Sequence, residues 1–172
     1  MPPRHNEELI LFNFSDPLAL VEWTSVNDAV MGGVSEGYIL WKDECTMLFS
    51  GSISFENNGG FSSIRSTVND YNLSAYKGIL IAAQGDGKRY KFTIRTTSSY
   101  DGASYQNHFL TIAKERRDYY LPFAAFLPSY HGKKLTNQPP LNPSLIKRFG
   151  FIIADSQEGP FSLGIETISA VR

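Results

Sequence analysis

The sequence predicts an all-β domain, built as a two-sheet jelly-roll sandwich of antiparallel strands. Apolar and polar residues alternate in many short runs, as where Tyr90, Phe92 and Ile94 are separated by Lys91 and Thr93. This period of two is typical of strands with one buried face. Aromatic residues make up 13% of the chain, and these residue types are favoured in strands. Turn-forming residues separate the runs about every ten residues, a spacing typical of sandwiches and barrels.

The alternating runs also predict which side chains form the core. Trp23 and Trp41 lie in amphipathic or alternating contexts, so we expect both indole rings to be buried. The same pattern predicts burial between the two sheets for a larger set of apolar residues: Phe49, Ile53, Phe55, Tyr90, Phe92, Ile94, Phe151, Ile153, Phe161 and Leu163.

Two glycine-containing segments are predicted to close hairpins. Asn57–Gly60 follows the run that ends at Phe55. Gly85–Gly87 separates the run Ile79–Gln84 from the run Arg89–Thr97. Glycine and Asn-Gly supply the positive φ angles that tight turns need. We therefore expect the strand after each segment to return antiparallel to the strand before it.

One short helix is expected near the N-terminus. Asp16 can cap the first turn and Pro17 suits the first helical position, ahead of the apolar stretch Leu18–Trp23. No repeat or linker divides the rest of the chain. We expect residues 1–8 to form a short tail and residues 9–172 to form a single domain.

The composition argues against several classes of partner. Sixteen basic and seventeen acidic residues give a net charge of -1 with no basic block, so we expect no nucleic-acid partner. Cys45 is the only cysteine, which excludes an intrachain disulfide. The apolar runs are too short for membrane insertion. The first eight residues lack an apolar signal core, so we expect an intracellular, cytoplasmic location and leave mitochondrial association open.

One motif suggests catalysis, but its context does not support it. Gly33–Gly37 matches the G-x-S-x-G pattern that holds a nucleophilic serine between a strand and a helix. The segment that follows, Tyr38–Trp41, has strand character instead. We expect Ser35 to be structural and the chain to have no catalytic residue, so that it is not an enzyme.

No metal or cofactor site is expected either. His5, His108 and His131 are scattered, and none forms a ligand pair at metal-binding spacing. Asp16 and Glu166 carry the kind of oxygens that a structural calcium ion would use. We interpret them as surface acids, with the calcium site as the alternative, and we predict no cofactor.

The most suggestive binding residues are two arginines and two tyrosines. Arg65 and Arg95 fall at polar positions of predicted strands, and Tyr100 and Tyr105 are close by in sequence. Planar guanidinium groups and aromatic rings could form a platform for a sugar or a peptide. We expect loss of either arginine to weaken partner binding and barely to change stability, because an exposed arginine contributes little to the fold. One alternative is that both arginines are only solvent-exposed residues on an outer face. The other is that they are buried and paired with acids, so that their loss unfolds the domain.

A loop adds three further candidates. Asn27 and Asp28 can cap nearby backbone amides and so fix the shape of the Asn27–Ser35 loop, and Met31 offers a flexible apolar contact. A loop that is ordered in advance loses little freedom when it binds. We predict that Asn27, Asp28 and Met31 contribute to partner binding.

An ordered set of motifs runs through nearly the whole chain. It consists of Trp23–Ser35, Phe49–Gly51, Glu56–Arg65, Gly85–Tyr90, Leu121–Pro128 and Gly159–Leu163. Together these motifs resemble the complex I intermediate-associated protein 30 family. The resemblance implies a galactose-binding-like jelly roll, related in fold to family 11 carbohydrate-binding modules. It brings no catalytic residues.

The best-known members of that family are chaperone-like factors that help to assemble the mitochondrial NADH:ubiquinone oxidoreductase. The resemblance therefore implies a non-catalytic protein-binding module that binds another protein or an assembly intermediate. A carbohydrate-binding module with the same sandwich is the alternative. Sugar-binding modules usually carry aromatic residues outside any core periodicity, whereas Trp23 and Trp41 fit one. We favour protein binding on this ground.

Overall fold

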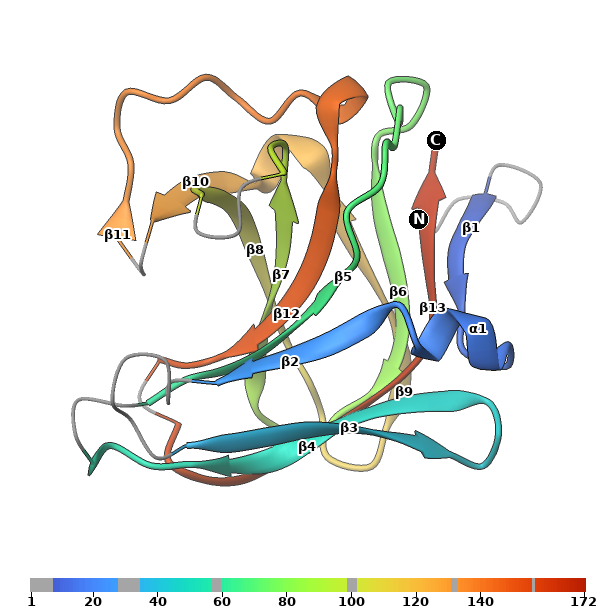
Figure 1. Ribbon diagram of the computed structural model, residues 1–172, viewed down its shortest axis with the longest axis vertical. Coiled ribbons are helices and arrows are strands. Elements are labelled where there is room, and N and C mark those ends of the chain that lie inside the picture. Colours follow the sequence, from blue (N-terminus) through green and yellow to red (C-terminus); the bar gives the residue numbers. More distant parts are fainter. Residues whose placement is uncertain (1–7, 28–34, 57–59, 99–101, 131–132, 156) are drawn as a thin grey trace.

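The computed structural model describes residues 8–27, 35–56, 60–98, 102–130, 133–155 and 157–172. Within these ranges the strands form two antiparallel sheets that lie face to face (Figure 1). The six-stranded sheet has the spatial order β3 (Glu36–Lys42), β4 (Thr46–Ile53), β13 (Gly159–Val171), β6 (Gly78–Gln84) and β9 (Arg116–Pro122), and β1 (Glu8–Asn13) also pairs with β13.

The second sheet has seven strands in the described residues. Their spatial order is β11 (Lys133–Lys134), β10 (Leu127–Tyr130), β8 (Ser104–Leu110), β7 (Arg89–Arg95), β12 (Arg148–Ile153), β5 (Ser62–Ser66) and β2 (Trp23–Asn27). Each sheet thus combines strands from distant parts of the chain. The predicted all-β sandwich of two antiparallel sheets is confirmed.

The core between the sheets is formed largely by the predicted side chains. Nine of the ten predicted positions are buried, and Trp23 is buried with them. Phe55 is the wrong prediction, since 44% of it is exposed. It lies beyond the end of β4, where the chain has already left the sheet. Trp41 is also wrong at 39% exposed. It lies on the edge strand β3, and its Nε1 donates to the Phe14 carbonyl at 2.8 Å.

Aromatic rings from neighbouring strands form the centre of this core. The ring of Phe92 meets that of Phe151 edge-on at 5.0 Å and stacks on Phe149 at 5.7 Å, measured between centroids. The ring of Tyr71 also belongs to this cluster, and its centroid lies 4.9 Å from that of Phe149. Edge-on and offset contacts of this kind add to the free energy gained by burying apolar area.

The predicted N-terminal helix is present but shorter than expected. α1 spans Pro17–Leu20, with Pro17 at its start, and the Asp16 carboxylate accepts from the Leu18 amide at 3.0 Å. The chain then enters β2 at Trp23, so the apolar stretch is divided between helix and strand. Glu8, assigned to the tail, begins β1. Within the described ranges, no helix has the length and apolar character needed to span a membrane.

Both predicted hairpins are wrong. β4 and β5 belong to different sheets, and so do β6 and β7. The two glycine-containing segments therefore carry the chain from one sheet to the other. Positive φ is present at Gly60 (136°) and Gly87 (92°), while residues 57–59 lie outside the described ranges. A positive φ permits a sharp change of direction and does not determine which sheet the chain enters.

Asp86 connects the Gly85–Gly87 crossover to both sheets through hydrogen bonds. Its carboxylate accepts from the Lys88 amide at 3.1 Å, from the Tyr90 hydroxyl at 3.0 Å and from the Ser162 amide at 2.8 Å. Burial, and secondarily the negative charge of Asp86, raises the pKa of the Tyr90 phenol. The phenol therefore stays protonated and keeps donating its hydrogen bond.

We predict that Phe92→Ala lowers the free energy of unfolding by about 3–5 kcal/mol, because it removes the ring at the centre of the aromatic cluster. Phe55→Ala is the matched control, because it removes the same ring from an exposed position and should change stability by less than about 1 kcal/mol. Urea unfolding of both variants measures the difference. Similar losses in the two variants would contradict this assignment of the core.

Candidate functional site

The side of the seven-stranded sheet that faces away from the core carries the predicted arginines. In β7 the side chains of Phe92 and Ile94 are in the core, so Thr93 and Arg95 project to the opposite side. Thr93 lies opposite Gly150 of β12, and Gly150 lies opposite Arg65 of β5. The structure thus brings Arg65 and Arg95 to the same side, as the sequence predicts.

We call this side the outer face. Its central residues come from four adjacent strands: Arg65 in β5, Arg148 and Gly150 in β12, Lys91, Thr93 and Arg95 in β7, and Ser104 and Gln106 in β8.

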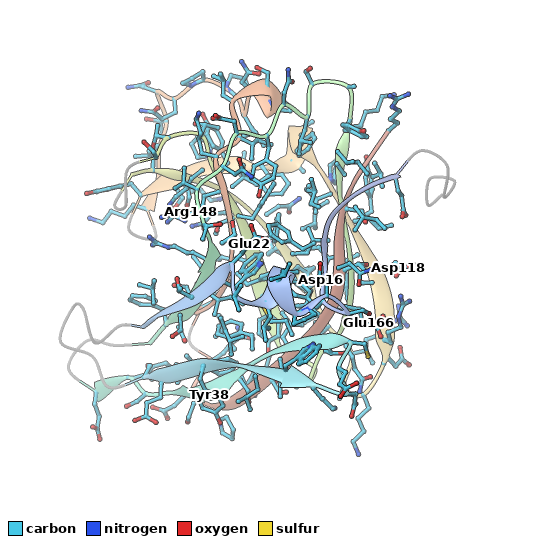
Figure 2. The ribbon with its side chains drawn as sticks, turned by 45° about the vertical axis from the view of Figure 1, so that its right-hand side comes forward. Asp16, Glu22, Tyr38, Asp118, Arg148 and Glu166 are labelled. Carbon is cyan, nitrogen blue, oxygen red and sulfur yellow. The ribbon has the colours of Figure 1, made fainter. Side chains whose placement is uncertain are left out.

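Arg148 is a third arginine that we did not single out from the sequence. It lies at the start of β12 (Figure 2) and pairs directly opposite Arg95. The pattern that would have found it was available, because Phe149 and Phe151 alternate into the core and leave Arg148 on the other side.

The centre of the outer face is closely packed although it points away from the core. Arg95 is only 6% exposed and Thr93 only 1%, while Arg65 is half-buried. The expectation that both arginines are solvent-exposed is therefore wrong. Gly150 explains part of the packing. A Cβ added there would lie 2.6 Å from the Thr93 hydroxyl oxygen and 2.8 Å from the Ile64 carbonyl oxygen.

Buried polar atoms without a hydrogen-bond partner on this face include Oγ1 of Thr93 and Nε of Arg148. Buried polar atoms are nearly always hydrogen-bonded in folded proteins, so such exceptions call for an explanation. Thr93 lies opposite Gly150 in the β7–β12 pairing, and Arg148 lies two residues before Gly150 on β12.

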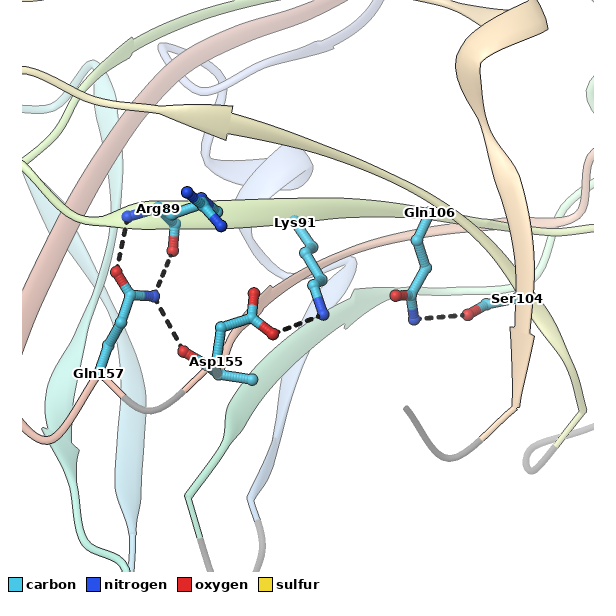
Figure 3. Close-up of polar contacts among 7 residues, drawn as sticks. Arg89, Lys91, Ser104, Gln106, Asp155 and Gln157 are labelled. Carbon is cyan, nitrogen blue, oxygen red and sulfur yellow. Dashed lines mark hydrogen bonds and ion pairs between the residues drawn. The ribbon is translucent and has the colours of Figure 1, made fainter. Parts of the chain in front are cut away.

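The sheet that carries this face is strongly segregated in charge. Its described strands contain seven basic residues (Arg65, Arg89, Lys91, Arg95, Lys133, Lys134 and Arg148) and no Asp or Glu. Asp155, which lies beyond the end of β12, accepts from Lys91 Nζ at 3.0 Å (Figure 3). Nearby, the Gln106 amide nitrogen donates to the Ser104 hydroxyl at 3.1 Å (Figure 3).

The predicted tyrosine platform does not form around Tyr105. This residue pairs opposite Ile94, on the core side, and is only 8% exposed. Its hydroxyl donates to the Pro139 carbonyl at 2.8 Å. The prediction is wrong because the alternation of β8 points Tyr105 inward. Tyr100 lies outside the described residues. At the outward positions of the described strands in this sheet, there is no Phe, Tyr or Trp.

The loop candidates are described only in part. Asn27 is the last residue of β2 and pairs with Ser62. Asp28 and Met31 lie outside the described residues, so their role in binding stays a prediction.

Ser35, the candidate nucleophile, is held by the backbone. Its hydroxyl is buried, donates to the Ser54 carbonyl at 3.0 Å and accepts from the Ser54 amide at 2.9 Å. The strand β3 begins at the next residue, Glu36, where a nucleophile elbow has a helix. Ser35 therefore joins two chain segments, which agrees with a structural role.

The two candidate calcium ligands, both labelled in Figure 2, have other partners. Asp16 caps α1, and Glu166 accepts from Arg116 Nε at 2.8 Å. The same guanidinium contacts Asp118 at 3.1 Å. In the part of the chain that the structure describes, no three His, Cys, Asp or Glu side chains are grouped as metal ligands would be.

A hollow of about 510 Å³ lies on the far side of the other sheet, between β4, β13 and the Gly85–Gly87 crossover. Asp86 and Glu166 contribute to its lining. Both carboxylates already accept hydrogen bonds from the protein. The outer face, with its unpaired donors, is therefore the stronger candidate site.

Comparison with known proteins decides the family. The family model described as Complex I intermediate-associated protein 30 (CIA30) matches residues 12–165. The chain belongs to the CIA30 family. The proteins named Complex I intermediate-associated protein 30, mitochondrial, from Mus musculus and Drosophila melanogaster are 24% and 22% identical over 92% and 96% of the chain. The alignments span 55% and 63% of those two proteins.

One further relative and one solved structure are also similar to this chain. An uncharacterized protein of Schizosaccharomyces pombe is 28% identical over 95% of the chain and 84% of its own length. The structure also superposes on the family 11 carbohydrate-binding module of Clostridium thermocellum, solved with a β-1,3-1,4-mixed-linked tetrasaccharide. That match has a TM-score of 0.70 and 17% identity, and it covers 95% of both chains. The galactose-binding-like jelly roll predicted for this CIA30-family chain is thus confirmed.

We predict that Ser35→Ala lowers the free energy of unfolding by about 1–3 kcal/mol, because the part-buried Ser54 amide loses its acceptor. At temperatures where the variant is folded, binding by this CIA30-family chain should be unchanged. Thermal unfolding combined with the binding assay described below measures both effects. If the folded variant lost a hydrolase activity that the wild type has, Ser35 would be a nucleophile after all.

Proposed function

We propose that this chain is a non-catalytic protein-binding module that acts as a chaperone-like assembly factor, as the name of its family suggests. The observation that carries the proposal is the outer face, where Arg65, Arg95 and Arg148 come together in a sheet whose described strands lack acids. Arginine is enriched among the residues that dominate the energy of protein interfaces. Binding would take place on a sheet that is already ordered, so little entropy is lost.

The proposed partner is an assembly intermediate of respiratory complex I. Support comes from the mouse and fly relatives, whose names place them in mitochondria and associate them with complex I. The chain matches only part of each. We therefore propose for it the binding step and a mitochondrial association, and no function that the remaining parts of those relatives carry.

A carbohydrate-binding module remains the second candidate, because the likeness to the family 11 module extends over nearly the whole of both chains. Sugar rings bind proteins largely by stacking on aromatic side chains. The outward positions of the described strands in the seven-stranded sheet offer no such ring. This difference supports protein as the ligand of the outer face.

We predict that Arg65→Ala and Arg95→Ala each reduce partner capture by about tenfold or more, as truncation of an interface hot spot does. The immobilised chain is incubated with detergent-solubilised mitochondria, and bound complex I subunits are quantified by mass spectrometry. Arg117→Ala is the matched control, because it removes an exposed arginine of the six-stranded sheet. It should leave capture unchanged.

Stability is measured in the same variants. Arg65→Ala should change the free energy of unfolding by less than about 1 kcal/mol, whereas Arg95→Ala should cost more because its side chain is buried. Capture that falls only in proportion to the unfolded fraction would contradict the proposed function. Retention of the wild-type chain by mixed-linked glucan in affinity electrophoresis would favour the carbohydrate alternative.

A further inference from the structure

The strand β1 has one edge that pairs with no strand in the described residues. Its other edge pairs with β13, and Figure 1 shows β1 at the margin of the six-stranded sheet. Outside this pairing, the backbone of Glu8–Phe12 makes no hydrogen bond to another described backbone group. An edge strand of this kind presents N–H and C=O groups with which a further strand can pair.

The composition of β1 does not protect this edge. Folded proteins commonly protect edge strands with charged side chains, which disfavour pairing with another chain. β9, the edge strand on the opposite side of the same sheet, follows this rule, because Arg116, Arg117 and Asp118 are exposed along it. In β1 one charged residue, Glu8, comes first, and four apolar residues follow it. The open edge of β1 is therefore suited to strand pairing.

A hollow of about 500 Å³ lies along this edge, between β1 and α1. Ile10 and Phe12 both contribute to its lining. They lie on opposite faces of β1, because a register shift separates them: Phe12 is in the core, whereas Ile10 is 56% exposed. A hollow that both faces of a strand line runs beside the edge of that strand. We call it the β1–α1 groove, and its lining includes Ile10, Phe12, Asp16, Leu18 and Glu22.

Two carboxylates give the groove a negative charge. Asp16 and Glu22, both labelled in Figure 2, line it, and its described lining contains no Lys, Arg or His. One oxygen of Asp16 accepts from the Leu18 amide. No hydrogen bond or ion pair joins the half-buried Glu22 carboxylate to another described residue. A lysine or arginine side chain of a partner would form charge-assisted hydrogen bonds with these groups.

The two faces of an added strand would meet different chemistry. Ile10 lies on the face of β1 opposite to the core residue Phe12. Glu22 lies toward the seven-stranded sheet, since Trp23 begins β2 and the Glu22 carbonyl accepts from the Thr67 amide at 2.8 Å. Successive side chains of a strand point to opposite faces. An added strand would therefore place alternate residues beside Ile10 and beside the carboxylates, which matches a segment of alternating apolar and basic residues.

We propose that the β1–α1 groove binds an extended segment of a partner protein, in which apolar and basic residues alternate. The segment pairs with β1 as a further strand of the six-stranded sheet. Its apolar side chains contact Ile10 and Leu18, and its lysine or arginine side chains bind Glu22 and Asp16. Backbone hydrogen bonds give such a complex its affinity, and the side chains give it specificity. The groove and the outer face belong to different sheets, so this inference goes beyond the proposed function.

The test uses the full chain and a fluorescein-labelled Val-Lys repeat peptide, followed by fluorescence anisotropy at low ionic strength. The wild type should bind this peptide and not its Val-Glu counterpart. Glu22→Gln keeps the shape of the side chain but removes its charge, so affinity should fall about fivefold or more. Leu18→Ser removes an exposed apolar contact and should also reduce affinity about fivefold or more.

Each of these substitutions has a matched control. Glu36→Gln removes an exposed acid of β3, and Leu145→Ser removes another exposed leucine. Both controls should bind the Val-Lys peptide as the wild type does. None of the four side chains is fully buried, so the melting temperature should change little in any variant. Equal binding of the Val-Lys and Val-Glu peptides, or equal losses in the variants and their controls, would overturn the proposal.

Two measurements distinguish strand pairing from a general attraction between opposite charges. In one, two Val-Lys peptides carry N-methyl groups on alternate backbone amides, one in each register. Since only one edge of the peptide faces β1, one methylated peptide should bind as the parent does and the other about tenfold or more weakly. In the other, hydrogen exchange in residues 8–13 should slow about tenfold or more in the complex. Equal binding of the two methylated peptides, or unchanged exchange in β1, would show that no strand is added.

Variants of the two sheets separate this inference from the proposed function. Arg65→Ala should leave binding of the Val-Lys peptide unchanged. If capture of complex I subunits depends on Arg65 but the wild type does not bind the peptide, the groove is wrong and the proposed function stands. If the peptide binds in the groove but Arg65→Ala captures as the wild type does, the proposed function fails instead. A wild-type dimer that the peptide converts to a monomer would identify a second copy as the occupant and would overturn this inference.

Discussion

The pairing of β7 with β12 determines both sides of the seven-stranded sheet. It sets Phe92 opposite Phe151 in the core, and it sets Arg95 opposite Arg148 on the outer face. Because side chains alternate along a strand, one choice of register decides both arrangements, and a shift by one residue would exchange them. The apolar side makes such a shift very costly. The core therefore holds the arginines together, although their mutual repulsion opposes that arrangement.

The sequence was informative wherever the decisive signal was local. Alternation placed Phe92 and Ile94 inside, and it placed Arg95 and Arg65 on one outer side. It failed at Phe55, which continues the pattern of β4 after the strand has ended. Tyr105 was misassigned because proximity in sequence to Arg95 was taken as proximity in space.

Features that depend on residues far apart in the chain could not be predicted from the sequence. Positive φ at Gly60 and Gly87 marks sharp changes of direction, but whether the chain then pairs with itself or joins the opposite sheet depends on strands far away. The burial of Thr93 likewise depends on Gly150, more than fifty positions along the chain. Nothing near Thr93 in sequence indicates that a glycine will face it across the sheet.

The long strand β13 has a consequence for how the protein is made. It pairs with β1, β4 and β6, so that Glu8 lies opposite Val171. During translation, β1 must therefore wait for a partner until nearly all of the residues described here have been synthesised. Such non-local pairing slows folding and leaves strand edges open to misassembly in the meantime. A chain proposed as a chaperone-like assembly factor would thus expose unpaired strand edges of its own while it is being synthesised.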